Sequence, residues 1–336
     1  MAQLFSNVGN LTWQQAVMWL IGGILIYLAV KRDMEPALLL PMGFGAILVN
    51  LPLSGAVTQI VDGVEEIGVL NVLFDAGIAN ELFPLLLFVG IGAMIDFEPL
   101  LNDPKLMFFG AAAQFGIFFT FSLAALLGFP IKDAAAIGII GAADGPTAIF
   151  MANFLRSNYL GAIMVAAYSY MALVPIVQPP VIRALTTTHE RRIRMPYHQH
   201  TVSRRTKILF PIIITAVCGI VSPRSVALVG FLMFGNLIRV CGVLDSLSET
   251  AQKTLSNLIT LFLGLTIAVR MQAEYFLTKQ TLLIMALGLV AFIFDTAGRR
   301  AGREGDQSVP AEGEKAQSHD RRLRHLGVPD VGARGL

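Results

Sequence analysis

Long blocks of apolar residues constrain this chain more than any other feature. They run to about 16 to 25 residues, the length at which a helix rising 1.5 Å per residue crosses about 30 Å of hydrocarbon. With 55% hydrophobic and 14% charged residues and a mean hydropathy of +0.66, the chain has more apolar surface than a soluble domain buries. We predict an all-α, polytopic transmembrane protein with candidate spans at 16–30, 36–53, 82–95, 105–127, 137–154, 160–182, 207–221, 225–240, 255–269 and 281–296. The acid-containing stretch 54–80 predicts a helix in the membrane interface.

The charge pattern indicates a membrane orientation and excludes one class of partner. A formal net charge of +2, with basic residues gathered in loops, argues against nucleic acid. The polar loop 183–207 is rich in arginine, so the positive-inside rule places it in the cytoplasm. The alternative is that a soluble partner docks on these arginines. We expect a multi-pass protein of a bacterial or archaeal inner membrane.

A weak internal repeat is present. The block 37–50 resembles 226–240, with Gly45 aligned to Gly235, and 83–97 resembles 258–271, with Gly90 aligned to Gly264. Two copies of one helical plan in the same order are typical of transporters built from inverted repeats. We predict a membrane domain over 1–298, with repeat one at about 36–154 and an incomplete repeat two at about 207–298.

The tail, 299–336, lacks Phe, Ile, Met, Tyr and Trp and cannot be a span. Its composition predicts a disordered extension. A sharper hypothesis is a shifted reading frame. Given suitable codons and read one base later, 317–334 becomes Asn-Pro-Met-Ile-Gly-Ala-Cys-Gly-Ile-Ser-Ala-Phe-Pro-Thr-Ser-Ala-Arg, an apolar, small-residue segment of the kind that repeat two lacks.

One acid lies beside a Gly-Pro pair inside an apolar block, in GIIGAADGPTAIF. A carboxylate at membrane depth costs several kcal/mol unless it is paired, protonated or ion-bound. Gly145 and Pro146 interrupt the helix and free backbone groups, which membrane proteins tolerate only around a cavity or within protein. We therefore predict a broken or re-entrant helix in which Asp144, freed carbonyls and the Thr147 hydroxyl bind Na⁺ or a proton. The alternative is a protonated or interfacial Asp144 without a transport role.

Two tyrosines follow in the next apolar block. Tyr168 and Tyr170 lie about 200° apart around a helix, so only one can face the same cavity as Asp144. A phenol can donate a proton or ligate a cation in an apolar site, which makes both candidate catalytic residues. Alternatively, either one anchors the membrane interface. Asn236 is a weaker candidate, because polar residues in spans often mark helix contacts.

These residues carry a resemblance to a known family. GIIGAADGPTAIF, VAAYSYMALVPIVQPP, LVGFLMFGNLIRVCGV and FPLLLFVGIGAMIDFEPLL resemble the β-subunit of the sodium-pumping, biotin-dependent decarboxylases of oxaloacetate, methylmalonyl-CoA and glutaconyl-CoA, over 1–298. The resemblance implies a membrane subunit that decarboxylates carboxybiotin on a partner carrier and couples this reaction to sodium export. The alternatives are a stand-alone cation/proton antiporter and a non-catalytic scaffold.

The resemblance also implies a site and partners. The family's sodium-binding aspartate falls on Asp144, and its proton-delivering tyrosine falls on Tyr170, with Tyr168 nearby. Na⁺ is the transported ion, and carboxybiotin comes from another subunit. The expected partners are a carboxyltransferase α-subunit, a biotin carrier protein, a small membrane γ- or δ-subunit and the lipid bilayer, with homo-oligomerisation left open. The family's second site segment, Asn-Pro-x-Ile-Gly and a later arginine, is absent in this frame, which implies a truncated, inactive chain.

Overall fold

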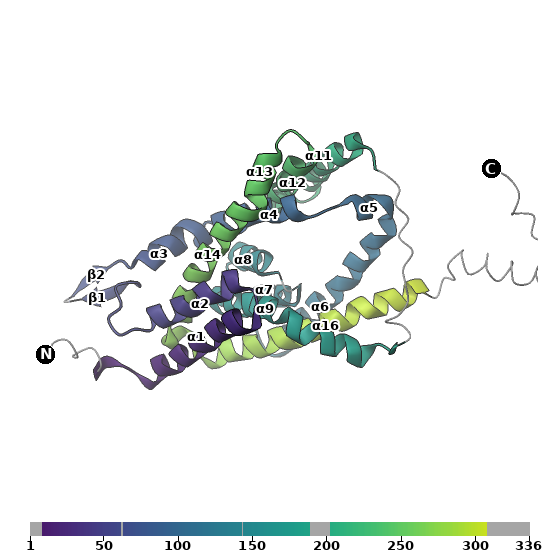
Figure 1. Cartoon of the computed structure of the whole chain (residues 1–336). Helices are drawn as coiled ribbons and strands as arrows, with labels where there is room; N and C mark the ends of the chain where they lie inside the picture. The colour runs from purple at the N-terminus through teal and green to yellow at the C-terminus, as the bar shows by residue number, and fades with distance from the viewer. Residues whose placement is uncertain (1–8, 62, 143, 189–201, 308–336) are drawn as a thin grey trace, which may run out of the picture.

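The computed structural model of the chain describes residues 9–61, 63–142, 144–188 and 202–307, which are mostly helical (Figure 1). Helices dominate because the apolar blocks can satisfy every backbone polar group within one segment. The first part contains α1 (Trp13–Arg32), α2 (Pro36–Val49), β1 (Gln59–Val61), β2 (Val64–Glu66), α3 (Val69–Phe74), the π-helix η2 (Asp75–Ala79), α4 (Leu82–Met94), α5 (Glu98–Asn102), η3 (Pro104–Leu106), α6 (Met107–Leu126), α7 (Ile131–Gly138), η4 (Ile139–Ala142), α8 (Gly145–Phe154) and α9 (Leu160–Leu185). The second contains α11 (Arg204–Val221), η5 (Pro223–Ser225), α12 (Val226–Val240), α13 (Asp245–Thr250), the π-helix η6 (Ala251–Leu255), α14 (Ser256–Ile267), η7 (Ala268–Met271), α15 (Ala273–Phe276) and α16 (Lys279–Gln307).

Several described helices are long and apolar enough to cross a bilayer. Three segments reach this length within the described part of the chain, namely Trp13–Arg32, Pro223–Val240 and Asp245–Met271. The pair Val69–Ala79 and Leu82–Met94 makes a fourth if its bend of 59° lies within one span. Other apolar helices, such as α2, are shorter. The predicted helical membrane protein is confirmed, although fewer helices reach full spanning length than the apolar blocks had indicated.

The two parts of the chain pack against each other in a reciprocal way. Helix α2 packs on α14, α12 packs on α4, and α6 packs on α16. By the repeat seen in the sequence, α2 corresponds to α12 and α4 corresponds to α14. Exchanging each helix for its counterpart turns the α2–α14 contact into the α12–α4 contact. Each part also contains the same sequence of elements, a short helix, a π-helix and a longer apolar helix, as α3–η2–α4 and as α13–η6–α14.

Aligned glycines lie at these contacts. A Cβ on Gly45 would lie 2.6 Å from the Cβ of Ala268, and one on Gly235 would overlap the carbonyl of Val89 in α4. A Cβ on Gly264 would lie 2.9 Å from the carbonyl oxygen of Leu38 in α2. Small residues let helix backbones approach closely inside a membrane, so these glycines set the spacing of the bundle.

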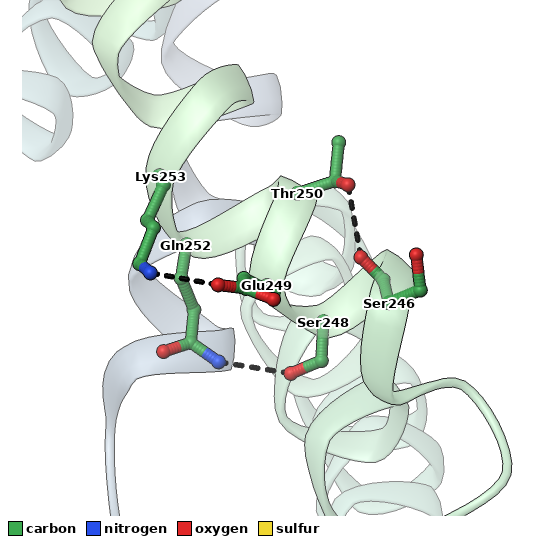
Figure 2. Close-up of polar contacts among 6 residues, drawn as sticks. All are labelled: Ser246, Ser248, Glu249, Thr250, Gln252 and Lys253. Atoms are coloured by element: carbon green, nitrogen blue, oxygen red, sulfur yellow. Dashed lines mark hydrogen bonds and ion pairs between the residues drawn. The ribbon is translucent and has the colours of Figure 1, made fainter.

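The segment Asp245–Met271 begins with polar side chains that bond to one another (Figure 2). Lys253 Nζ lies 2.7 Å from a carboxylate oxygen of Glu249, and Gln252 donates to the Ser248 hydroxyl at 2.9 Å. Glu249 and Lys253 are largely exposed, so their ion pair stabilises the fold little. These contacts mark the polar end of an otherwise apolar helix.

One expectation from the sequence needs correction. The stretch 54–80 is not one interfacial helix: β1 and β2 form an antiparallel hairpin that projects from one end (Figure 1), and α3 begins only at Val69. Gly63 has φ +82°, which permits the hairpin turn, and the β-branched residues around it favour strands. Helix α16 extends to Gln307, beyond residue 298, the expected end of the membrane domain. Residues 308–336, and 189–201 of the basic loop, lie outside the described part.

Candidate functional site

The helix break predicted at the Gly-Pro pair is present. Helical structure ends with η4 and restarts with α8 at Gly145, while Asp144 has extended backbone angles of φ −120° and ψ 101° at the N-cap of α8. Pro146 falls in the first turn of α8, where its missing N–H removes no helical hydrogen bond. Thr147 donates its hydroxyl hydrogen to the Asp144 carboxylate. The positive end of α8 therefore lies at a carboxylate, which is the favourable polarity.

The chain entering α7 meets the chain leaving α8. Asp133, which is fully buried, accepts hydrogen bonds from the Ser157 hydroxyl at 2.7 Å, the Asn158 backbone N–H at 2.9 Å and the Asn158 side-chain amide at 3.3 Å. Lys132 donates to the carbonyl of Arg156 at 3.1 Å. Helices α7 and α8 are thus two limbs of one broken unit, with Asp144 at the junction opposite these bonds.

Both limbs pack closely on neighbouring helices. A Cβ on Gly138 would lie 3.0 Å from the carbonyl oxygen of Ile117, and one on Gly141 would lie 3.4 Å from the carbonyl carbon of Gly116, both in α6. On the other limb, the Asn153 amide donates to the carbonyl of Ile78 in η2 at 2.9 Å. Backbone contact on one side and a polar tether on the other hold the unit in the bundle.

Tyr168 lies directly against the break. A Cβ on Gly145 would be 2.6 Å from Cζ of Tyr168, so the phenol occupies the space that the glycine leaves beside Asp144. The Tyr168 side chain is 1% exposed, and its hydroxyl has no hydrogen-bond partner among the described residues. A buried hydroxyl without a partner is costly and rare, so it points to a ligand of this site.

Tyr170 faces another neighbour. Its hydroxyl donates to the carbonyl of Met285 in α16, and its ring fills the space beside Gly288 on the same helix. The structure therefore brings Asp144, Thr147 and Tyr168 together, and places Tyr170 as a link between α9 and α16. The angle of about 200° between positions two apart on a helix is the geometric reason.

Asn236 has a structural role. Its amide donates to the carbonyl of Ile95 at 3.0 Å, and beside it Arg239 donates to the carbonyl of Met94 at 2.6 Å. These bonds satisfy carbonyls that α4 leaves open at its C-terminus. The weaker candidate from the sequence is thus a helix cap between α12 and α4.

Asp133 is the polar residue that sequence reasoning missed. It follows Pro130 and Lys132 at the edge of an apolar block, where a charged residue is expected to be solvated. Its complete burial depends on Ser157 and Asn158, which lie far along the chain. The Phe-Pro-Ile-Lys-Asp sequence could have indicated a helix start, but it contains no sign of these partners.

The chemistry available at the break is that of hard oxygen ligands. One carboxylate and two hydroxyls lie where the backbone departs from helical geometry, and the buried hydroxyl of Tyr168, which has no hydrogen-bond partner among the described residues, is available to a ligand. Such a set suits a small alkali cation or an exchangeable proton.

Comparison with known proteins identifies a family. The family described as the Na⁺-transporting oxaloacetate decarboxylase beta subunit matches residues 14–301. The glutaconyl-CoA decarboxylase subunit beta of Acidaminococcus fermentans is 48% identical over 287 residues, which cover 85% of this chain and 74% of the relative. The methylmalonyl-CoA decarboxylase subunit beta of Veillonella parvula is 49% identical over 287 residues, with the same coverage of 85% and 74%. The oxaloacetate decarboxylase beta chain of Klebsiella pneumoniae is 41% identical over 337 residues, covering 84% of this chain and 78% of the relative.

The resemblance noted in the sequence is therefore confirmed, and this chain belongs to the family of Na⁺-transporting decarboxylase β-subunits.

Proposed function

We propose that this chain is the membrane subunit of a Na⁺-translocating decarboxylase, in which decarboxylation of carboxybiotin on a partner carrier drives sodium export. The observation that supports it best is the site at the helix break, where Asp144 accepts a hydrogen bond from Thr147 beside the buried hydroxyl of Tyr168, which has no partner among the described residues. Membership of a Na⁺-transporting family supports the choice of cation.

The Na⁺ ligands in this proposal are Asp144 and Thr147, with the hydroxyl of Tyr168 completing the set. When Na⁺ binds, the Thr147 hydroxyl turns its lone pairs to the cation and releases the carboxylate oxygen that it holds in the described structure. The bound cation offsets the cost of a carboxylate in an apolar surrounding. A proton on Asp144 does the same, so Na⁺ and H⁺ compete for one group.

The unit α7–η4–α8 is proposed to be re-entrant. The bonds of Asp133 to Ser157 and Asn158 bring its two ends to one side, which supports two half-spans rather than one span. Helix α8 has 10 residues, and at about 1.5 Å per residue it extends about 15 Å, half of a hydrocarbon core of about 30 Å. Asp144 then lies near the bilayer midplane, where transporters hold their ions.

The reciprocal packing of α2 on α14 and α4 on α12 supports an inverted repeat. In this proposal repeat one spans about 36–154 and repeat two about 207–298. Alternating access would come from movement of one helix group relative to the other around the site. The arginine-rich loop 183–207 would face the cytoplasm, where a soluble carrier can reach it.

In this proposal the tyrosines donate the proton that decarboxylation requires. In decarboxylation of carboxybiotin the C–N bond breaks, CO₂ leaves and the ring nitrogen takes up a proton, so a proton donor is required. Tyr168 lies beside Asp144, and we assign it the first transfer. Tyr170, the other candidate, must release the carbonyl of Met285 before it can donate elsewhere.

A β-subunit works beside other subunits. In the proposal, the biotin carrier protein and a carboxyltransferase α-subunit supply the carboxylated biotin. A small membrane γ- or δ-subunit and lipid complete the expected surroundings.

Replacing Asp144 by Asn in the assembled complex, with the reading frame after Gly298 restored in every variant, tests the proposal. We expect Na⁺-dependent decarboxylation and ²²Na⁺ uptake into inverted vesicles to be abolished, because Asn cannot supply the charge. Asp245→Asn, at an exposed acid in the first turn of α13, is the matched control and should leave both intact. Unchanged Na⁺ dependence in Asp144→Asn would refute the assignment.

A further inference from the structure

We propose that Asp133 is a positioning residue for the cation site, because it fastens the two ends of the broken helix together and so fixes the place of Asp144 at the junction. The set of Asp133, Ser157 and Asn158 is called the clasp below. This inference rests on the proposed function, since it concerns the affinity of the same site.

The clasp is a buried carboxylate whose hydrogen-bond donors, among the described residues, all come from one short segment. Asp133 is 0% exposed and accepts from the Ser157 hydroxyl and from both N–H groups of Asn158. A carboxylate only accepts hydrogen bonds, and charge-assisted bonds are about twice as strong as neutral ones. The neighbouring Lys132 directs its ammonium group to the carbonyl of Arg156 instead. Asp133 therefore holds the segment after α8 by three bonds.

The end of α8 is shaped to deliver these donors. Arg156 is left-handed, with φ 49°, and the Ser157 N–H donates to the carbonyl of Ala152 at 2.9 Å. This is a Schellman turn, and it reverses the chain directly after the helix. Beyond it, Tyr159 lies edge-on to Phe129, with ring centroids 5.4 Å apart, next to the start of α7. Polar and aromatic contacts thus close the same end of the unit.

Asp144 lies at the opposite end of both limbs. Each limb is short, so the position of the junction depends on how the clasp holds the other ends of α7 and α8. If the clasp opens, the junction moves relative to Tyr168, and the fraction of molecules able to bind Na⁺ falls. Apparent affinity falls in proportion to that fraction. The clasp therefore acts on Na⁺ binding through position, without touching the ion.

The test compares Asp133→Asn with the exposed control Asp245→Asn in the assembled complex. Half-saturating Na⁺ for decarboxylation and the rate at saturating Na⁺ are measured separately. We expect Asp133→Asn to raise half-saturating Na⁺ about tenfold, the equivalent of about 1.4 kcal/mol, while the saturated rate is largely kept. A lowered saturated rate with unchanged half-saturation would overturn the proposal, because it would indicate general damage.

Two further variants keep the test decisive if Asp133→Asn does not assemble. Ser157→Ala removes one bond and should give a smaller shift in the same direction; no shift would overturn the proposal. In a background with Cys218→Ser and Cys241→Ser, Asp133→Cys together with Ser157→Cys should cross-link on oxidation and restore Na⁺ affinity, which reduction then weakens. A cross-linked protein as weak as Asp133→Asn would also contradict it. If the unsubstituted complex shows no Na⁺ dependence, the proposed function itself fails.

Discussion

Replacing Tyr168 by Phe distinguishes two roles of this side chain: a hydroxyl that binds the cation and a ring that packs beside Gly145. The side chain is 1% exposed and its hydroxyl has no hydrogen-bond partner among the described residues, so without a bound cation this hydroxyl is an unsatisfied polar group. Such a group costs about 1–3 kcal/mol. Phe keeps the ring that fills the space beside Gly145 and removes only the hydroxyl. We therefore expect Tyr168→Phe to raise the free energy of unfolding by about 1–3 kcal/mol without Na⁺.

The response to Na⁺ should change in the opposite direction. A ligand at 100 times its dissociation constant stabilises a folded protein by about 2.7 kcal/mol. The unsubstituted protein should show a gain of this order, and Tyr168→Phe should show less, because one ligand is lost. The assay is denaturant unfolding in detergent micelles, with NaCl replacing choline chloride at constant ionic strength.

Tyr170→Phe is the matched control. It removes a hydroxyl that does have a partner, the carbonyl of Met285, so it should destabilise the protein by about 0.5–1.5 kcal/mol and leave the Na⁺ gain unchanged. The reasoning would be refuted if Tyr168→Phe were less stable than the unsubstituted protein in choline and still gained the full increment in NaCl.

Three further outcomes are expected from unfolding measurements in the same micelles. Gly235→Ala should destabilise by about 1–3 kcal/mol, because its Cβ would overlap the carbonyl of Val89; a neutral effect would contradict the α4–α12 packing. Arg156→Gly should stabilise by about 0.5–1 kcal/mol by relieving a left-handed conformation, and a loss of stability would contradict the Schellman turn. Glu98→Gln breaks a half-buried ion pair of 2.6 Å with Lys207 and should cost under about 1 kcal/mol, less still in high salt; a larger, salt-independent loss would disagree.

The helix break shows what local sequence can decide. Pro146 lacks a backbone N–H and has a backbone angle suited to the first turn of a helix, so the Gly-Pro pair favours a new helix start at α8. The membrane environment also follows from local sequence, because the apolar blocks have the length and composition of helices that cross lipid. An acid beside such a break indicates a cation or proton site before any contact is known. The family resemblance follows from these same residues.

Local sequence could not decide which side chains meet. Helical periodicity predicts that Tyr168 and Tyr170 point in nearly opposite directions, but it does not say which helix lies on either side. The packing of α9 places Tyr168 against Gly145 and Tyr170 against α16. The burial of Asp133 likewise depends on donors more than twenty residues away in the chain, at 2.7 and 2.9 Å.

The sequence by itself thus determined the membrane environment, the broken helix and the acid at its end, because these depend on composition and on backbone chemistry within a few residues. Tertiary structure alone decided the reciprocal pairing of α2 with α14 and α4 with α12, and the partners of each buried polar group. Burial is a property of the whole packing arrangement, so a polar side chain acquires its role only when distant segments enclose it.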